Sequence, residues 1–264
     1  MNFRAMVWSV RREVWENRSI YIAPLIVAAI IIFGALIAAL AGRNAAQHYD
    51  IAAGALMGTT LIVAIFYCLD ALYGERRDRS ILFWKSMPVS DLNAVLSKMA
   101  IPLVILPIVT FVVTVATHLI MLLLSSAFLS MHGHSPAALW ALPWLQMSFE
   151  ILYHLLSVHA IGYAPIFGWL LLVSAWAKRL PFLWAFLPPA AIGVVEKVVF
   201  NTSRFGNMIG SILSGGETMK GGGSMFGHFN PGEFLSRPGL WIGLVVAAIC
   251  LAGAVRLRRY RDPI

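Results

Sequence analysis

The longest polar run between two apolar spans of this chain reads Tyr73-Gly-Glu-Arg-Arg-Asp-Arg-Ser-Ile-Leu-Phe-Trp-Lys-Ser-Met-Pro-Val-Ser-Asp-Leu-Asn-Ala-Val-Leu-Ser-Lys98. After Tyr73 and Gly74 it contains five consecutive charged residues and continues, after one serine, into an apolar group: Ile81, Leu82, Phe83 and Trp84. Pro88 predicts a turn, after which Ser90 is placed to cap a helix that enters the next span. Phe83 and Trp84, beside so many charges, are predicted to meet either the lipid interface or a groove on a partner protein.

The composition around this run is that of an integral membrane protein. The 264 residues are 59% hydrophobic, with a mean hydropathy of +0.79, and only 12% are charged, whereas a soluble domain carries roughly 25% charged residues. A net charge of +8 would suggest nucleic acid in a soluble protein, but here the basic residues cluster at the ends of apolar spans. We therefore expect no nucleic-acid partner. Cys68 and Cys250 lie within apolar spans and predict no disulfide framework.

Six apolar segments are long enough for a bilayer core, which needs about 20 residues. They cover residues 21–41, 51–73, 100–127, 148–176, 181–200 and 239–256. The first shows no small-residue cleavage pattern, so we expect no signal peptide. Before it, residues 2–18 place apolar side chains on one helical face: Phe3, Met6, Val7, Val10 and Val14. Trp8 and Trp15 flank that face, which favours a helix in the membrane interface over one packed on other protein.

The sequence thus predicts an all-α, polytopic membrane protein. An interfacial helix occupies residues 1–19, and a six-span domain follows over 20–264, with a cytoplasmic segment at 74–99 and an outer glycine-rich segment at 201–238. Most of the glycine-rich segment is expected to be flexible, after one short helix that contains Met208, Ile209, Ile212 and Leu213. Pro188 and Pro189 should bend or break the fifth span.

Lys and Arg are distributed unequally across the predicted spans. Fifteen of the twenty lie on one side, in the N-terminal segment, in 74–99, between the fourth and fifth spans, and at the C-terminus. The positive-inside rule therefore predicts that both termini are cytoplasmic.

Motifs for nucleotide binding and for catalysis are missing. The sequence contains no P-loop, no His-Glu-x-x-His, no Gly-x-Ser-x-Gly and no Cys-x-x-Cys. Asp70 is the only acid well inside a span, near its cytoplasmic end, where it can snorkel or pair with Arg76 or Arg77 rather than carry protons. We expect the chain to be no enzyme and to hold no cofactor of its own.

All seven histidines fall in the outer half of this topology: His48, His118, His132, His134, His154, His159 and His228. Glu150 and His154 are four residues apart on one helical face, and the loop histidines His132 and His134 precede them. Imidazole and carboxylate suit zinc or copper, which leaves a membrane enzyme as one alternative. Because the spacings match no known ligand motif, we expect no metal site.

Three stretches resemble the permeases of bacterial ABC type-2 exporters. They are Val10-Arg-Arg-Glu-Val-Trp-Glu-Asn-Arg-Ser-Ile-Tyr-Ile-Ala-Pro24, Glu75-Arg-Arg-Asp-Arg-Ser-Ile-Leu-Phe-Trp-Lys-Ser-Met-Pro-Val-Ser90 and Ser174-Ala-Trp-Ala-Lys-Arg-Leu-Pro-Phe-Leu-Trp184. The resemblance implies a cell inner membrane protein in which the second stretch forms a coupling helix that docks on a separate ATP-binding subunit. The residues it assigns to this coupling are Glu75, Arg76, Arg77, Asp78, Arg79, Ile81, Leu82, Phe83 and Trp84. Two permeases, two ATPase subunits, and ATP and magnesium in the ATPase would complete the exporter.

Six spans are few for a bulky solute, and the chain has no energy source of its own. Both facts favour a homodimer with the pathway at its interface, lined partly by the second and fifth spans. Candidate lining residues are Thr59, Thr60 and Tyr67. Two alternatives stay open: a membrane sensor or assembly factor that works with an ATPase but passes no solute, and a 74–99 segment whose aromatic residues pack on lipid or the chain itself while Glu75 and Arg76 are merely solvated.

Overall fold

The computed structural model describes residues 3–41, 49–86, 89–133, 135–141, 144–213 and 231–260, and every regular element within them is a helix. Five helices are long and apolar enough to cross a membrane, and a sixth crossing results if one bent helix pair is counted as a span. The chain is therefore an all-α, multi-pass membrane protein, as its apolar segments predict.

The first half of the chain forms the amphipathic helix α1 (Phe3–Glu16) and the first three spans. Spans one and two are α2 (Ser19–Leu40) and α3 (Tyr49–Ala71). The charged segment forms α4 (Tyr73–Arg77) and α5 (Ser80–Ser86). Span three is a run of 41 residues made of α6 (Asp91–Ala100), the π-helical η2 (Ile101–Ile105) and α7 (Leu106–Met131). At 1.5 Å per residue this run is about 60 Å long, so it extends well past the expected 100–127 span and a bilayer core.

The second half contains the bent pair and two further spans. After α8 (Ala137–Trp140), span four consists of α9 (Trp144–His154), the π-helical η3 (Leu155–Gly162) and α10 (Ala164–Trp176), with a 44° bend between η3 and α10. The bend falls where Pro165 can donate no backbone hydrogen bond. α11 (Pro181–Phe200) and α12 (Arg204–Leu213) follow, and then α13 (Pro231–Ser236) and α14 (Pro238–Tyr260).

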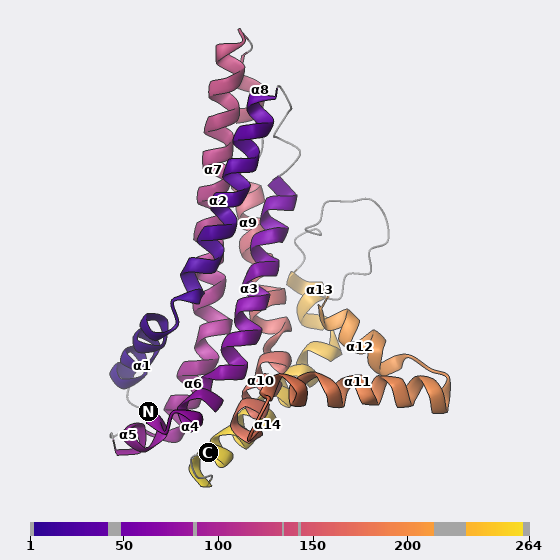
Figure 1. Cartoon of the computed structure of the whole chain (residues 1–264). Helices are drawn as coiled ribbons and strands as arrows, with labels where there is room; N and C mark the ends of the chain where they lie inside the picture. Colours follow the sequence, from indigo (N-terminus) through magenta and orange to yellow (C-terminus); the bar gives the residue numbers. More distant parts are fainter. Residues whose placement is uncertain are drawn as a thin grey trace.

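Figure 1 shows how these helices are arranged. α2, α3 and α7 run side by side as a long bundle, and α1, α4, α5 and the C-terminal end of α14 lie at the same end of it. α11 and α12 form a hairpin that projects away from this bundle, and α11 has only 6% of its span buried. The break predicted at Pro188 and Pro189 is absent, because α11 continues through both prolines despite the two backbone donors that they lack.

The short helix predicted before the glycines is confirmed as α12. Its first turn is held by Glu196 of α11, whose carboxylate accepts the backbone N–H groups of Arg204 at 2.7 Å and Phe205 at 2.8 Å. A carboxylate at this position satisfies amide groups that have no partner inside the helix. The two helices of the hairpin are thereby fixed relative to one another.

The main hydrophobic core lies between α3, α10 and α14. The backbones of α10 and α14 come close together at Gly168, where an added Cβ would lie 3.2 Å from both the Cα and the carbonyl oxygen of Ala247. Among other glycines of the spans, Gly243 meets Pro165, whereas Gly58 and Gly239 have no atom within 4 Å of an added Cβ. Close helix packing therefore centres on α10, not on α3.

Replacing Gly168 with leucine is expected to lower the free energy of unfolding by about 1–3 kcal/mol, because the side chain must push the backbone of α14 away. The same change at Gly58, which has no atom within 4 Å of an added Cβ, is the matched control and should be neutral or slightly stabilising. Unfolding by sodium dodecyl sulfate in mixed micelles measures both variants. Equal effects at the two positions would contradict the close approach.

Candidate functional site

The 73–98 segment folds into α4, α5 and the start of span three. Arg79 adopts the left-handed conformation with φ of 58°, which lets the chain turn between α4 and α5. Ser90 is extended, and its hydroxyl accepts the N–H of Asn93 at 3.2 Å. The predicted helix cap is therefore confirmed. The turn predicted at Pro88 lies outside the described residues.

The nine residues predicted to couple to a partner divide into two groups. Three are buried in this chain: Glu75, Arg76 and Ile81. Five are exposed: Arg77, Asp78, Arg79, Leu82 and Phe83. Trp84 is half-buried. The expectation that Glu75 and Arg76 are merely solvated is therefore wrong, since both are held inside the protein by ion pairs or hydrogen bonds.

Glu75 is the centre of a buried cluster of charges. One carboxylate oxygen lies 3.1 Å from Nζ of Lys98 and 3.5 Å from Nη2 of Arg12. The other accepts a hydrogen bond of 3.0 Å from Nη2 of Arg258. Three cations from α1, α6 and α14 thus meet on one carboxylate of α4. Such a group is stable in a low dielectric only when its charges are balanced and hydrogen-bonded.

Two further acids complete this balance. Glu13 of α1 accepts hydrogen bonds from Nζ of Lys98 at 2.8 Å and from the hydroxyl of Tyr67, on α3, at 2.9 Å. Asp91, at the start of α6, accepts one of 2.7 Å from Nη1 of Arg258. We call these three cations and three carboxylates the charge cluster: Arg12, Glu13, Glu75, Asp91, Lys98 and Arg258. It ties α1, α4, α6 and α14 together at one end of the bundle.

Glu13 is 1% exposed. Burial alone would raise its pKa, but the Lys98 ammonium, the Arg12 guanidinium and the hydrogen bonds from Lys98 and Tyr67 outweigh it, and the pKa of this carboxyl lies below its usual value. The ionised form is therefore the one that holds α1 against the bundle.

A glutamine at position 13 should reveal this contribution through its pH dependence. Because the folded-state pKa of Glu13 is lowered, its stabilisation is complete above the usual pKa of 4.5 and disappears as the pH falls through the lowered value. The difference in unfolding free energy between the wild type and Glu13→Gln should be constant from pH 7 to about 5 and shrink below that. Micelle unfolding across this pH range measures it. A difference that grows on acidification would contradict the assignment.

Arg76 fastens α4 to a different helix. Its Nη2 donates to the carbonyl oxygens of Ser174 at 2.9 Å and Ala177 at 2.6 Å, at the end of α10. The Ser174 hydroxyl accepts the N–H groups of Leu72 and Tyr73 and donates to the carbonyl of Leu69. The junction between α3 and α4 is thus cross-linked to α10 by groups that the ends of helices otherwise leave unpaired.

One side of α5 rests on α1, and another is open. The Arg12 guanidinium lies 3.6 Å from the centre of the Trp84 ring, a cation–π contact, and the Phe83 ring meets Trp84 edge-on. Leu82 and Phe83 are 58% and 61% exposed. These two side chains form the apolar surface that α5 offers, and the exposed charges of Arg77, Asp78 and Arg79 precede them in the sequence.

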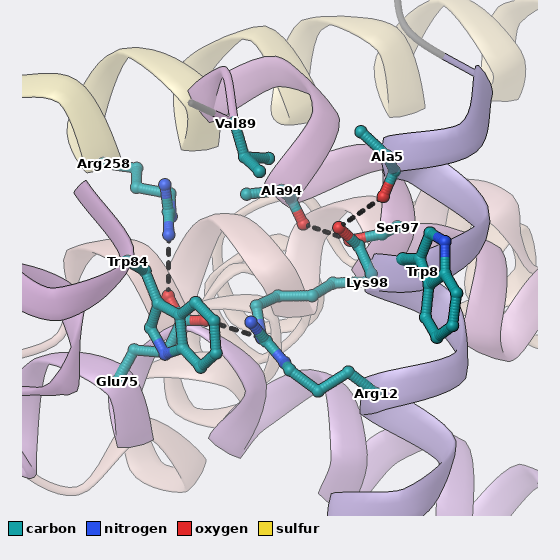
Figure 2. A pocket seen from close by; sticks show the side chains of 11 residues that line it. Ala5, Trp8, Arg12, Glu75, Trp84, Val89, Ala94, Ser97, Lys98 and Arg258 are labelled. Atoms are coloured by element: carbon teal, nitrogen blue, oxygen red, sulfur yellow. Dashed lines mark hydrogen bonds and ion pairs between the residues drawn. The ribbon is translucent and has the colours of Figure 1, made fainter. Parts of the chain in front are cut away.

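A cavity of about 230 Å³ opens beside the charge cluster (Figure 2). Its walls come from α1, α4, α5, α6, α14 and the turn before α6, and they are formed by Ala5, Trp8, Ser9, Arg12, Glu75, Trp84, Val89, Ala94, Ser97, Lys98 and Arg258. In Figure 2, Arg258 reaches Glu75 from above and Arg12 reaches it from the right.

The residues predicted to line a pathway occupy different environments. Thr60 is buried, and its hydroxyl bonds to that of Thr110 on α7. Tyr67 is buried against Glu13, while Thr59 is partly exposed and donates to the carbonyl of its own helix. Of the three, only Thr59 has surface to offer in this conformation. The pairing expected for Asp70 is present with Arg77, at 3.7 Å.

The outer histidines do not converge in the described part of the chain. There, no three side chains among His, Cys, Asp and Glu group so that they could hold a metal ion. The Glu150 carboxylate accepts a hydrogen bond from Gln146, and the ring centroids of His154 and His159 lie 5.6 Å apart, with the two ring planes tilted at 57°. His132 bonds to the carbonyl of Phe128. His48, His134 and His228 lie outside the described residues.

The sequence interpretation missed five of the six members of the charge cluster, since it had singled out only Glu75. Glu13 shares a helical face with Val10 and Met6, and an acid on an apolar face was the available signal. Lys98 and Arg258 stand at the ends of apolar spans, where the positive-inside rule already accounts for them. Asp91 stands directly after the Ser90 cap, a position where an acid also suits the helix dipole.

Comparisons of the chain with models of protein families, with characterised proteins and with solved structures find no match in any of the three. The function of this multi-pass membrane protein therefore has to be inferred from the geometry of α5 and the charge cluster, and from the three sequence stretches that resemble exporter permeases.

Proposed function

We propose that this chain is the transmembrane subunit of an ATP-driven exporter of the ABC type-2 kind. It forms the solute pathway as a dimer in the bacterial inner membrane, with both termini in the cytoplasm. Two copies of a separate ATPase subunit bind ATP and magnesium and hydrolyse the nucleotide, and this chain performs no catalysis.

The observation that carries the proposal is the construction of α5. Its exposed pair Leu82 and Phe83 stands at the end of the bundle where the basic residues collect, next to a buried cluster of charges. An exposed apolar pair with charges beside it has the composition of an interface centre with a polar rim. A segment that only lay on lipid would not need Glu75 and Arg76 to be buried and tied to four other helices.

The charge cluster supplies a mechanical connection from that surface to the spans. Glu75 lies one turn before α5 and is bonded to α6, which continues into the third span, and to α14, the last span. Arg76 is bonded to the end of α10. When nucleotide closes the two ATPase subunits, a displacement of α5 is transmitted to these helices as one body, because ion pairs in a low dielectric resist separation.

Co-expression with a candidate ATP-binding-cassette ATPase tests the proposal. We expect a complex of two chains with two ATPase subunits, whose hydrolysis rate depends on this chain, and ATP-driven solute movement when the complex is placed in vesicles. A stable complex that hydrolyses ATP but moves no solute from a library of candidates would favour the sensor or assembly role. Purification without any ATPase would contradict both.

A further inference from the structure

Two arginines that line the cavity beside the charge cluster, Arg12 and Arg258, each carry a buried Nε that forms no hydrogen bond with the described residues. Arg258 donates hydrogen bonds from Nη1 to Asp91 and from Nη2 to Glu75. Its Nε has no hydrogen-bond partner among the described residues, even though the side chain is only 4% exposed. Nε of Arg12 is likewise buried and forms no hydrogen bond within the described part of the chain, although it is ion-paired with Glu16 at 3.4 Å. Buried donors are nearly always satisfied in proteins, so two of them on one cavity point to a ligand that accepts hydrogen bonds.

The charges on the wall favour an anionic acceptor. Arg12, Lys98 and Arg258 line the cavity, whereas Glu75 is the only acid among the described residues that line it. Glu13 and Asp91 balance these cations but do not line it. Each of the two arginines offers its Nε, and a phosphate carries several oxygens on one centre that accept charge-assisted hydrogen bonds. An acceptor with two oxygens on one centre, such as a phosphate, therefore fits these donors better than a single carbonyl does.

The rest of the wall favours a lipid as the source of that phosphate. Trp8, 65% exposed, and Trp84 line the cavity, and tryptophan settles at the level of lipid headgroups. Ala5, Val89 and Ala94 supply apolar wall beside the donors. On the exposed face of α1, Arg11 lies over the rings of both Trp8 and Trp15, as expected for a helix facing phospholipid.

We propose that this cavity binds the phosphate group of a membrane phospholipid, with Arg258 and Arg12 donating to its oxygens. The lipid then joins α1 to α14 through the same side chains that hold the charge cluster together. The proposal does not depend on an ATPase partner.

Native mass spectrometry of the delipidated full chain in detergent tests it. The probes are phosphatidylglycerol and phosphatidylethanolamine, a diacylglycerol with the same acyl chains but no phosphate, and inorganic phosphate. We expect one saturable adduct per chain with each phospholipid, at least tenfold weaker retention of the diacylglycerol, and no displacement by millimolar phosphate. Binding of inorganic phosphate in place of lipid would overturn the lipid as the source, and equal retention of the diacylglycerol would overturn the phosphate site.

Two variants locate the adduct. Ala94→Leu fills the cavity and changes no charged group, so it should weaken phospholipid retention at least tenfold. Ala29→Leu makes the same change at an exposed position of α2 and should leave retention unchanged. Arg258→Lys keeps a cation beside Glu75 and Asp91 but removes Nε, and it should weaken retention severalfold even if Ala94→Leu does not fold. Retention equal to the wild type in the folded cavity variants would overturn the proposal.

Discussion

Glu75→Gln is expected to lower the free energy of unfolding by about 3 kcal/mol, the largest effect among the changes considered for this chain. The substitution preserves shape but removes the carboxylate on which Arg12, Lys98 and Arg258 converge. Three cations, of which Lys98 and Arg258 are buried and Arg12 is half-buried, then face two acids. Removing one partner from a buried ion pair costs more than the pair contributes, because the remaining charge stays desolvated. Titration with sodium dodecyl sulfate in mixed micelles, followed by far-ultraviolet circular dichroism, measures the change.

Two further variants separate charge balance from lost contacts. Asp78 belongs to the same segment, but its side chain is exposed. Asp78→Asn should therefore leave the free energy of unfolding unchanged. Glu75→Gln combined with Lys98→Met leaves two cations and two acids, and it should be more stable than Glu75→Gln alone. If the double variant is instead less stable than that single variant by the full cost of Lys98→Met, the charges act independently and no cluster exists.

Much of the fold follows from local pattern. The apolar spans are recognisable because a helix needs about 20 apolar residues to cross a bilayer core. Ser90 predicts the start of a helix because its hydroxyl accepts a backbone N–H of the first turn. The fifth span begins at Pro181 as the sequence indicates. These features depend on residues that are close together along the chain, so they can be predicted from the sequence.

The charge cluster and the exposed hairpin depend on distant residues instead. Glu13, Glu75, Lys98 and Arg258 meet because α1, α4, α6 and α14 pack at one end of the bundle, and nothing in the local sequence pairs position 13 with position 98. Within the charged 73–98 segment, the sequence does not show which charged side chains are buried, since both Glu75 and the exposed Asp78 are acids within the same run of charges. Its helical phase and its neighbours decide that Glu75 turns inward.

The structure also changes how the coupling role of α5 has to be tested. Leu82→Ala/Phe83→Ala removes only the exposed pair, so the chain should fold and unfold as the wild type does. If the pair sits in a groove of the ATPase, affinity for that subunit should fall at least tenfold, which corresponds to about 1.4 kcal/mol. Hydrolysis stimulated by this chain should fall with it. Trp84 is unsuitable for this purpose because its ring stacks on Arg12, and its removal would disturb α1 as well.

Phe33→Ala/Ile37→Ala serves as the matched control for that pair. Both side chains lie on α2, with exposures of 63% and 52%, so the control removes comparable apolar surface away from α5. It should leave the ATPase bound. Raising the salt concentration should weaken the wild-type complex only moderately, because Arg77 and Arg79 belong to the exposed rim, where screening is strong. If the ATPase stays bound and fully stimulated with Leu82 and Phe83 truncated, α5 is not the docking helix, and the buried charge cluster serves the stability of the bundle alone.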